Sequence, residues 1–110
     1  MSENGEVIDM GETIYNLAFD FGASSGRMIL SKFENGKIEL EELHRFSNDP
    51  VRIGKNFYWD TFRLYHELKQ GLKKAAAKKI PIQSLAIDTW GVDYALIDKD
   101  GNVIGNPINY

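Results

Sequence analysis

The chain lacks several features that define whole classes of protein. Its 110 residues include no cysteine, so neither a disulfide framework nor a metal site with cysteine ligands is available to it. The two histidines, His44 and His66, do not have the spacing of metal ligands. No apolar run approaches the roughly 20 residues that span a bilayer. The acidic start of the chain does not resemble a signal peptide, so we expect a cytoplasmic protein without a membrane partner.

The chain also lacks a large excess of either charge. The formal net charge is −3 and the basic residues form no long block, so nucleic acid is not an expected partner. A hydrophobic content of 43% and a charged content of 26% are ordinary for a globular domain with one small core. Residues 1–13 carry acidic but no basic side chains. We expect them to form a disordered tail ahead of a folded part, residues 14–110.

Three strand patterns open the folded part of the sequence. Residues 14–19 are mostly apolar, which predicts a central strand covered on both faces. Residues 28–33 and 38–46 follow as two further strands. The Asn35-Gly36 pair between them tolerates the positive φ of a tight hairpin turn. The three strands therefore predict an antiparallel meander.

A helix and one more strand come next. Residues 48–56 are predicted to be a loop, and Asp60 to cap a helix that runs to about Lys79. The buried stripe of this helix is predicted from apolar residues four apart, namely Leu64, Leu68, Leu72 and Ala76, widened by Phe62, Tyr65 and Ala75. Residues 82–87 predict a strand that a right-handed crossover makes parallel to the first strand. A hairpin is expected over residues 94–104.

The most informative motif lies between the first two strands. Glycines in this turn let the backbone approach a phosphate closely, and consecutive N–H groups of a turn form an anion-binding concavity. The predicted phosphate-binding residues are Gly22, Ala23, Ser24, Ser25, Gly26 and Arg27. Asp20, at the end of the first strand, suits water-mediated binding of Mg²⁺. Ordinary hairpin turns use the same residue types, so a turn without any ligand is the alternative.

A second motif, Asp88-Thr89-Trp90-Gly91-Val92-Asp93, follows the last strand. Parallel pairing places Asp20 and Asp88 at neighbouring carboxyl ends of strands, where sheets of α/β proteins bind ligands. Together, the two motifs resemble the FGGY family of carbohydrate kinases, in the actin-like ATPase superfamily. The resemblance runs from about Tyr15 to Tyr110. The second motif and the His44-Arg45-Phe46 element are closest to the branch that phosphorylates L-rhamnulose.

The resemblance implies a fold and an activity. The fold would be part of a ribonuclease H-like α/β domain, here a three-stranded antiparallel meander, a crossover helix, a parallel strand and a hairpin. The activity would be ATP-dependent phosphorylation of a ketose, most closely L-rhamnulose to L-rhamnulose 1-phosphate, with ATP and Mg²⁺ over the turn. The sugar would lie near Asp88, Trp90, Gly91 and Asp93. The bare backbone of Gly91 could donate to a hydroxyl.

Two of these residues have equally good structural interpretations. Trp90 could stack on the sugar or be a core tryptophan, and Asp93 could bind a hydroxyl or cap a turn. In the family the general-base aspartate lies far downstream, so we expect no catalytic residue here. We expect an inactive fragment, whose exposed apolar patch would favour self-association. The alternatives are another FGGY kinase, acting on xylulose, fuculose or glycerol, a non-catalytic actin-like sugar-sensing module, and a small domain without a site.

Overall fold

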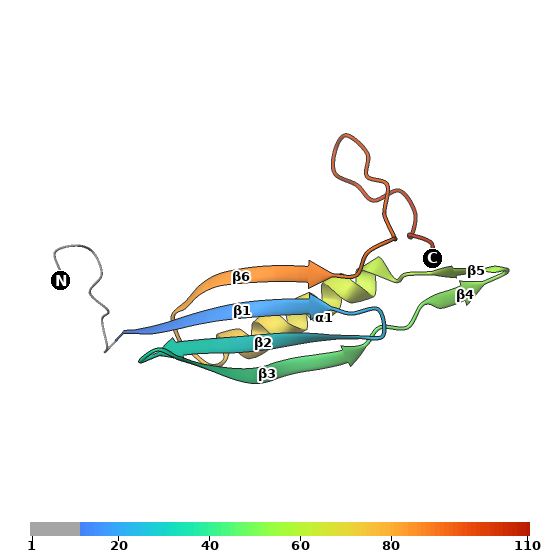
Figure 1. The fold of residues 1–110 in the computed structure, drawn as a ribbon. Helices are drawn as coiled ribbons and strands as arrows, with labels where there is room; N and C mark the ends of the chain where they lie inside the picture. Colours follow the sequence, from blue (N-terminus) through green and yellow to red (C-terminus); the bar gives the residue numbers. More distant parts are fainter. Residues whose placement is uncertain (1–11) are drawn as a thin grey trace.

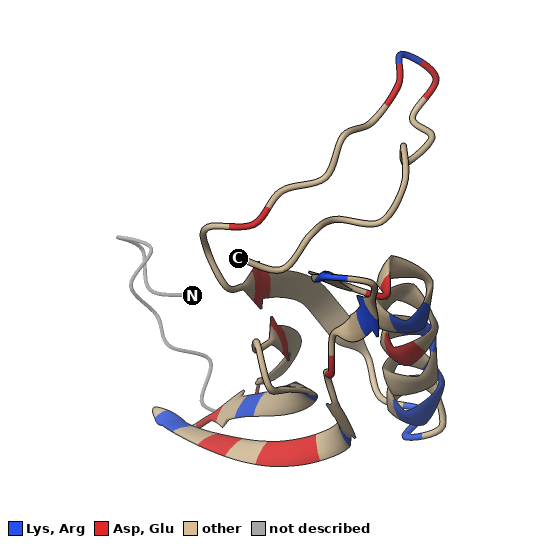
Figure 2. Ribbon diagram, turned by 90° about the vertical axis from the view of Figure 1, so that its right-hand side faces the viewer, with Lys and Arg blue, Asp and Glu red and all other residues tan. Residues whose placement is uncertain are grey.

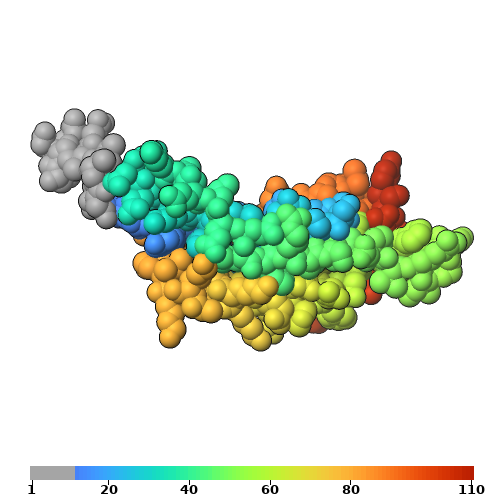
Figure 3. All heavy atoms as spheres, turned by 90° about the horizontal axis from the view of Figure 1, so that it is seen from below, coloured from blue at the N-terminus to red at the C-terminus, as the bar shows by residue number. Residues whose placement is uncertain are grey.

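The computed structural model describes residues 12–110, and the predicted tail lies almost wholly outside them. A four-stranded sheet carries one helix on one face, and a short two-stranded hairpin extends from one end (Figure 1). Seen from below, these parts form an elongated body with the hairpin projecting at its tip (Figure 3). No helix in the described part of the chain is both long and apolar enough to span a membrane.

The large sheet has the predicted topology. Strands β1 (Thr13–Phe21), β2 (Ser25–Glu34) and β3 (Lys37–Ser47) form an antiparallel meander. Strand β6 (Ile82–Thr89) lies parallel to β1 on its other side, which gives the order β3-β2-β1-β6. This pairing brings the carboxyl ends of β1 and β6 together, and both sequence motifs begin at that end.

The connections are only partly as predicted. Asn35 and Gly36 have φ angles of 54° and 76°, as the hairpin signal requires. The predicted loop over residues 48–56 is wrong, because β4 (Val51–Ile53) pairs with β5 (Asn56–Tyr58). Strands of three residues are too short to show an alternating pattern, so the sequence conceals them.

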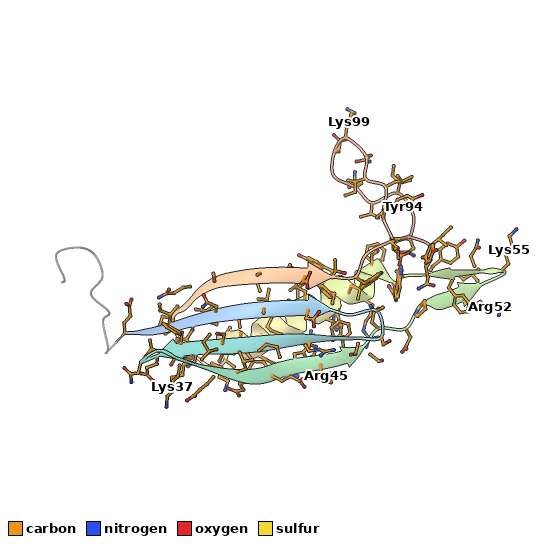
Figure 4. The ribbon with its side chains drawn as sticks, viewed as in Figure 1. Lys37, Arg45, Arg52, Lys55, Tyr94 and Lys99 are labelled. Atoms are coloured by element: carbon orange, nitrogen blue, oxygen red, sulfur yellow. The ribbon has the colours of Figure 1, made fainter. Side chains whose placement is uncertain are left out.

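The segment after β6 is a projecting loop rather than a regular hairpin. Its two sides meet at one isolated antiparallel bridge, Ile97 to Val103, formed by hydrogen bonds from the Asp98 N–H to the Asn102 carbonyl (2.9 Å) and from the Ile104 N–H to the Leu96 carbonyl (2.8 Å). Tyr94 lies near the base of this loop and Lys99 at its tip (Figure 4). The expected hairpin is therefore present only as a minimal contact.

Helix α1 (Thr61–Ala76) begins as predicted, since the Asp60 carboxylate accepts the N–H of Arg63 at 3.1 Å. It ends three residues before Lys79, which has a positive φ of 56°. The predicted buried stripe is confirmed only in part: Ala75 is buried and Leu64 and Leu68 pack against the core, whereas Phe62 and Tyr65 are exposed and Leu72 is exposed in part. The residues that α1 buries are Glu67, Gly71 and Ala75.

The choice of buried face on α1 follows from where the helix lies. Helix α1 packs over β2 and β3 rather than over the centre of the sheet. At Gly71 a Cβ would lie only 3.1 Å from the Met28 side chain and 3.2 Å from Phe19, so a glycine permits the close approach. Charged side chains also join the edge strand to the turn that follows the helix, as in the pair Lys78–Glu41 at 2.7 Å. Figure 2 shows acidic residues along β3 and basic residues along α1.

The core lies between the sheet and α1. Its buried members are Leu17, Phe19, Met28, Leu30, Phe46 and Ala75. The prediction that β1 is covered on both faces is wrong for the described residues, because Ala18, which points to the opposite face, is exposed. A strand as apolar as β1 predicts a packing layer on each face of the sheet, and the described residues supply a layer on one face only.

Candidate functional site

The turn between β1 and β2 is a tight loop held by backbone hydrogen bonds. The N–H of Gly22 donates to the Ser25 carbonyl at 2.9 Å, and Ala23 and Ser24 are exposed at the tip. A Cβ on Gly22 would lie 2.6 Å from the Ser25 carbonyl oxygen, closer than atoms in a folded protein approach. The turn therefore depends on glycine at position 22 for its shape.

At position 26, glycine is required by side-chain packing rather than by the shape of the turn. A Cβ at this position would lie 2.3 Å from the ring of Phe46, on β3. Phe46 belongs to the buried core and stacks against the His44 ring, with centroids 5.9 Å apart. The second glycine of the motif thus lets the sheet core extend beneath the turn.

Charged groups flank the turn on the side away from α1. Asp20 and Arg27 are register partners on β1 and β2, with Arg27 Nε 3.9 Å from Asp20 Oδ2. The guanidinium also donates to Ser25 Oγ at 3.1 Å, while its Nε is buried without a hydrogen-bond partner among the described residues. An unsatisfied donor beside a glycine turn is a feature that an anionic ligand would complete.

Asp88 joins this group from the neighbouring strand. It is the register partner of Asp20 in the parallel pair of β1 and β6, so both carboxylates lie at the same sheet end and on the same face. The structure thereby brings together the two acidic residues that open the two motifs. Within residues 12–110, no three acidic or histidine side chains are grouped closely enough to form a metal site by themselves.

Asn48 is a member of this site that sequence reasoning did not assign. It is 5% exposed, its side-chain Nδ2 donates to the Gly22 carbonyl at 2.9 Å, and its backbone N–H donates to the Ser24 carbonyl at 2.9 Å. The only available signal was its place directly after the third strand. Asparagine side chains commonly bind backbone groups in turns, but here the partner is 26 residues away.

The second motif is built around Asp93. Its Oδ2 accepts the indole N–H groups of both Trp59 and Trp90 at 2.8 Å, and its Oδ1 accepts the backbone N–H of Tyr110 at 2.8 Å. The two indole rings lie 4.4 Å apart between centroids, at 47° to each other. Trp59 is buried, and sequence reasoning had not included it among the site residues.

These contacts set the charge state of Asp93. Burial alone would raise its pKa, but the donors from Trp90, Trp59 and Tyr110 outweigh burial and hold the pKa below its ordinary value. Asp93 is therefore a stable anion in neutral solution. Gly91, two residues earlier, is exposed, and a Cβ there would meet only open space.

A hollow of about 160 Å³ lies beside the two tryptophans, and Leu64, Tyr94 and Pro107 line it further. A larger cavity, about 290 Å³, lies at the opposite end of the sheet near Tyr15 and Lys78, away from both motifs. The smaller hollow is the better candidate for a binding site, since it adjoins the second motif at the carboxyl end of β6.

His44 and Arg45, for which the sequence offered no role, make local contacts. His44 Nε2 lies 2.7 Å from Glu67 Oε1 on α1, and its Nδ1 lies 2.9 Å from Lys74 Nζ. Arg45 forms a bidentate pair with Glu42, with Nη2 2.7 Å from Oε1 and Nε 3.0 Å from Oε2. Both residues therefore secure β3, one against the helix and one along the strand.

Known proteins similar to this chain are sugar kinases. A rhamnulokinase of Bacteroides thetaiotaomicron is 47% identical over 93 residues, which are 84% of this chain and 19% of that protein. A rhamnulokinase of Mannheimia succiniciproducens is 46% identical over 101 residues, 89% of this chain and 21% of that protein. No family model matches the sequence.

A solved structure gives the same picture of the fold. The gluconate kinase from Lactobacillus acidophilus superposes with a TM-score of 0.70 at 14% identity, covering 88% of this chain and 20% of that one. The predicted fold class, a partial α/β domain with an antiparallel meander, a crossover helix and a parallel strand, is confirmed. The chain spans about a fifth of the length of the relatives it matches, and over that span the predicted resemblance to the rhamnulokinases is confirmed.

Proposed function

We propose that the chain is part of an ATP-dependent sugar kinase that converts L-rhamnulose to L-rhamnulose 1-phosphate. The observation that carries this proposal is the identity of 42–47% with several rhamnulokinases over most of the chain. Each match covers only about a fifth of the relative, so the activity is proposed for the protein at its natural length. A cytoplasmic location stays a prediction.

The turn between β1 and β2 is proposed to hold the terminal phosphates of ATP. The unpartnered Arg27 Nε and the glycine turn fit an anion at this place. Exposed backbone N–H groups near Ala23 and Ser24, with the Ser25 hydroxyl, would supply donors. The cofactor supplies the phosphoryl group, and the residues of this chain neutralise its charge and fix its direction.

Asp20 is proposed to bind Mg²⁺ through water. Magnesium is usually held by one or two carboxylates, several waters and the phosphates of the nucleotide rather than by a complete protein cage. Asp20, half exposed and beside Asp88 at the sheet end, fits that sparse ligand set. The Asp20–Arg27 ion pair would keep both side chains directed at the turn.

The segment from Asp88 to Asp93 is proposed to hold the sugar. The open surface around Gly91 leaves its backbone accessible to a sugar hydroxyl, and Asp88 is exposed at the end of β6. Trp90 would offer an apolar ring face beside the hollow of about 160 Å³. Both carboxylate oxygens of Asp93 accept hydrogen bonds, Oδ2 from Trp59 and Trp90 and Oδ1 from the Tyr110 N–H, so we assign it the role of holding Trp90 rather than the sugar.

The transfer itself needs a base that accepts the proton of the attacking sugar hydroxyl. The bond from that oxygen to phosphorus forms while the bond from phosphorus to the β–γ bridging oxygen of ATP breaks. The resemblance places the aspartate that acts as general base outside residues 1–110. We therefore propose that these residues contribute binding groups alone and transfer no phosphate by themselves.

The test is ADP release by the protein purified at its natural length. L-rhamnulose, L-fuculose, D-xylulose and glycerol serve as separate acceptors, with residues 1–110 alone as the negative control. Strong preference for L-rhamnulose is expected. Preference for another acceptor would replace the sugar while keeping the kinase, and ATP turnover with none of them would overturn the kinase proposal in favour of a sugar-sensing module.

A further inference from the structure

We propose that Asn48 is a positioning residue that orients the Gly22–Ala23 peptide so that its N–H points outward to the phosphates of ATP. The inference rests on the proposed function, because it concerns the same turn. It adds a residue that directly follows the carboxyl end of β3 and belongs to neither motif.

The geometry starts from the Gly22 carbonyl. Asn48 Nδ2 donates to this oxygen at 2.9 Å, which draws the carbonyl inward, toward the end of β3. In a trans peptide the C=O and N–H groups point in opposite directions, and the described chain has no cis peptide. The N–H of Ala23 therefore points away from Asn48, at the exposed tip of the turn.

A rotated peptide would have the opposite effect on an anion. It would aim the partial negative charge of the Gly22 carbonyl at the phosphates and withdraw the Ala23 N–H. A turn of small, exposed residues has little packing of its own to prevent that rotation. The buried Asn48 amide supplies the missing restraint, and the backbone N–H of the same residue fixes the Ser24 carbonyl as well.

The position of Asn48 makes this restraint rigid. The side chain is 5% exposed and lies directly after the last residue of β3, which pairs with the first residue of β2. Solvent cannot replace this amide without cost, since the Asn48 side chain is buried between the sheet end and the turn. The turn thus inherits its shape from the sheet.

The experiment measures nucleotide affinity directly, so that it does not depend on turnover. The protein at its natural length is titrated calorimetrically with Mg²⁺ and a non-hydrolysable ATP analogue, and separately with L-rhamnulose. The variants are Asn48→Ala, Asn48→Asp, which keeps the size but replaces the donor, and Ser47→Ala as a control at the exposed neighbouring position.

We expect Asn48→Ala to weaken nucleotide binding about tenfold, the equivalent of losing one hydrogen bond, here the bond from Asn48 to the Gly22 carbonyl. Asn48→Asp should weaken it at least as much, because its carboxylate faces the Gly22 carbonyl. Sugar affinity should not change in either variant, and Ser47→Ala should match the unsubstituted protein. Faster amide exchange at Gly22 without ligand would report the loosened turn.

Two results would overturn the inference. One is unchanged nucleotide affinity in both Asn48 variants. The other is a parallel loss of nucleotide affinity, sugar affinity and thermal stability, which would make Asn48 a general stabilising residue. If the unsubstituted protein binds no nucleotide, the phosphate site and this inference fail together. If it binds nucleotide but phosphorylates no sugar, only the proposed reaction fails.

Discussion

Asp93 shows how a single carboxylate connects three separate parts of the chain. It accepts the indole N–H groups of Trp59, before α1, and Trp90, after β6, together with the backbone N–H of Tyr110. A shared anionic acceptor is stronger than three separate neutral ones, because each bond is charge-assisted. The walls of the hollow beside the second motif therefore depend on the charge of one residue.

This dependence predicts how the fluorescence of the protein responds to pH. The donors to Asp93 hold its pKa below the ordinary value of 3.8. Such a carboxylate contributes stability above its unfolded pKa and loses it only as pH falls through the folded pKa. Tryptophan emission should therefore be constant from neutral pH down to about 4 and shift only at lower pH.

The chain has two tryptophans, and both contact Asp93, so their emission reports on this cluster. Asp93→Ala should produce the acid emission spectrum already at neutral pH. Asp98→Asn is the matched control, because Asp98 also has a lowered pKa but bonds only to residues of its own loop. An unchanged spectrum in Asp93→Ala would contradict the arrangement.

At the scale of elements, a buried charge joins α1 to β3 in addition to the apolar contacts of the helix with the core. Glu67 is 5% exposed and is bonded to His44, on β3, and to Arg63, one turn earlier on α1. Burial alone would raise the pKa of Glu67, but the bonds from His44 and Arg63 outweigh it, and the pKa lies below its ordinary value. The ionised form is thus the one that the fold selects.

We expect Glu67→Gln to lower the free energy of unfolding at neutral pH by about 1–3 kcal/mol, since a buried charged acceptor for His44 and Arg63 is replaced by a weaker, neutral one. The unsubstituted protein should lose the same contribution as pH falls below the ordinary 4.5 and through the folded pKa. Urea unfolding at several pH values measures both effects.

Glu39→Gln, at an exposed position on β3, serves as the control for this substitution. It should leave the unfolding free energy nearly unchanged. An equal loss in both variants would show that the effect is one of overall charge. A parallel pH profile for Glu67→Gln and the unsubstituted protein would show that Glu67 carries no linkage.

The elements themselves were largely predictable from sequence, but their faces only in part. Hairpin chemistry at Asn35 and the cap at Asp60 are local signals, and both were read correctly. Spacing along α1 identified the helix and part of its buried face, including Ala75, but missed Glu67 and Gly71, because their partners lie on distant strands. Periodicity alone does not contain that information.

For the whole molecule, the unbalanced cover of the sheet is the main physical feature. Leu85 and Ile87 on the edge strand β6, and Phe62 on α1, are 42%, 55% and 83% exposed. Apolar surfaces of this kind normally mark contact with another piece of protein. The expected self-association of residues 1–110 stays a prediction, which sedimentation across a range of concentrations tests: a single monomeric species throughout would reject it.

The same scale shows what sequence could predict of the site. Both motifs, their glycines and the juxtaposition of Asp20 with Asp88 follow from strand order and register. Asn48 and Trp59 were missed because their partners are 26 and 34 residues away, and only the closed fold brings them together. Long-range polar contacts have no periodic signature, whereas strands and turns do.

The most direct test of the account is hydrogen–deuterium exchange on the protein at its natural length, with and without each ligand. A non-hydrolysable ATP analogue with Mg²⁺ should slow exchange in the turn from Asp20 to Arg27. L-rhamnulose should slow it in the segment from Asp88 to Asp93. Protection of both segments by their own ligands is the predicted result, and protection confined to other parts of the protein would contradict the assignment of both sites.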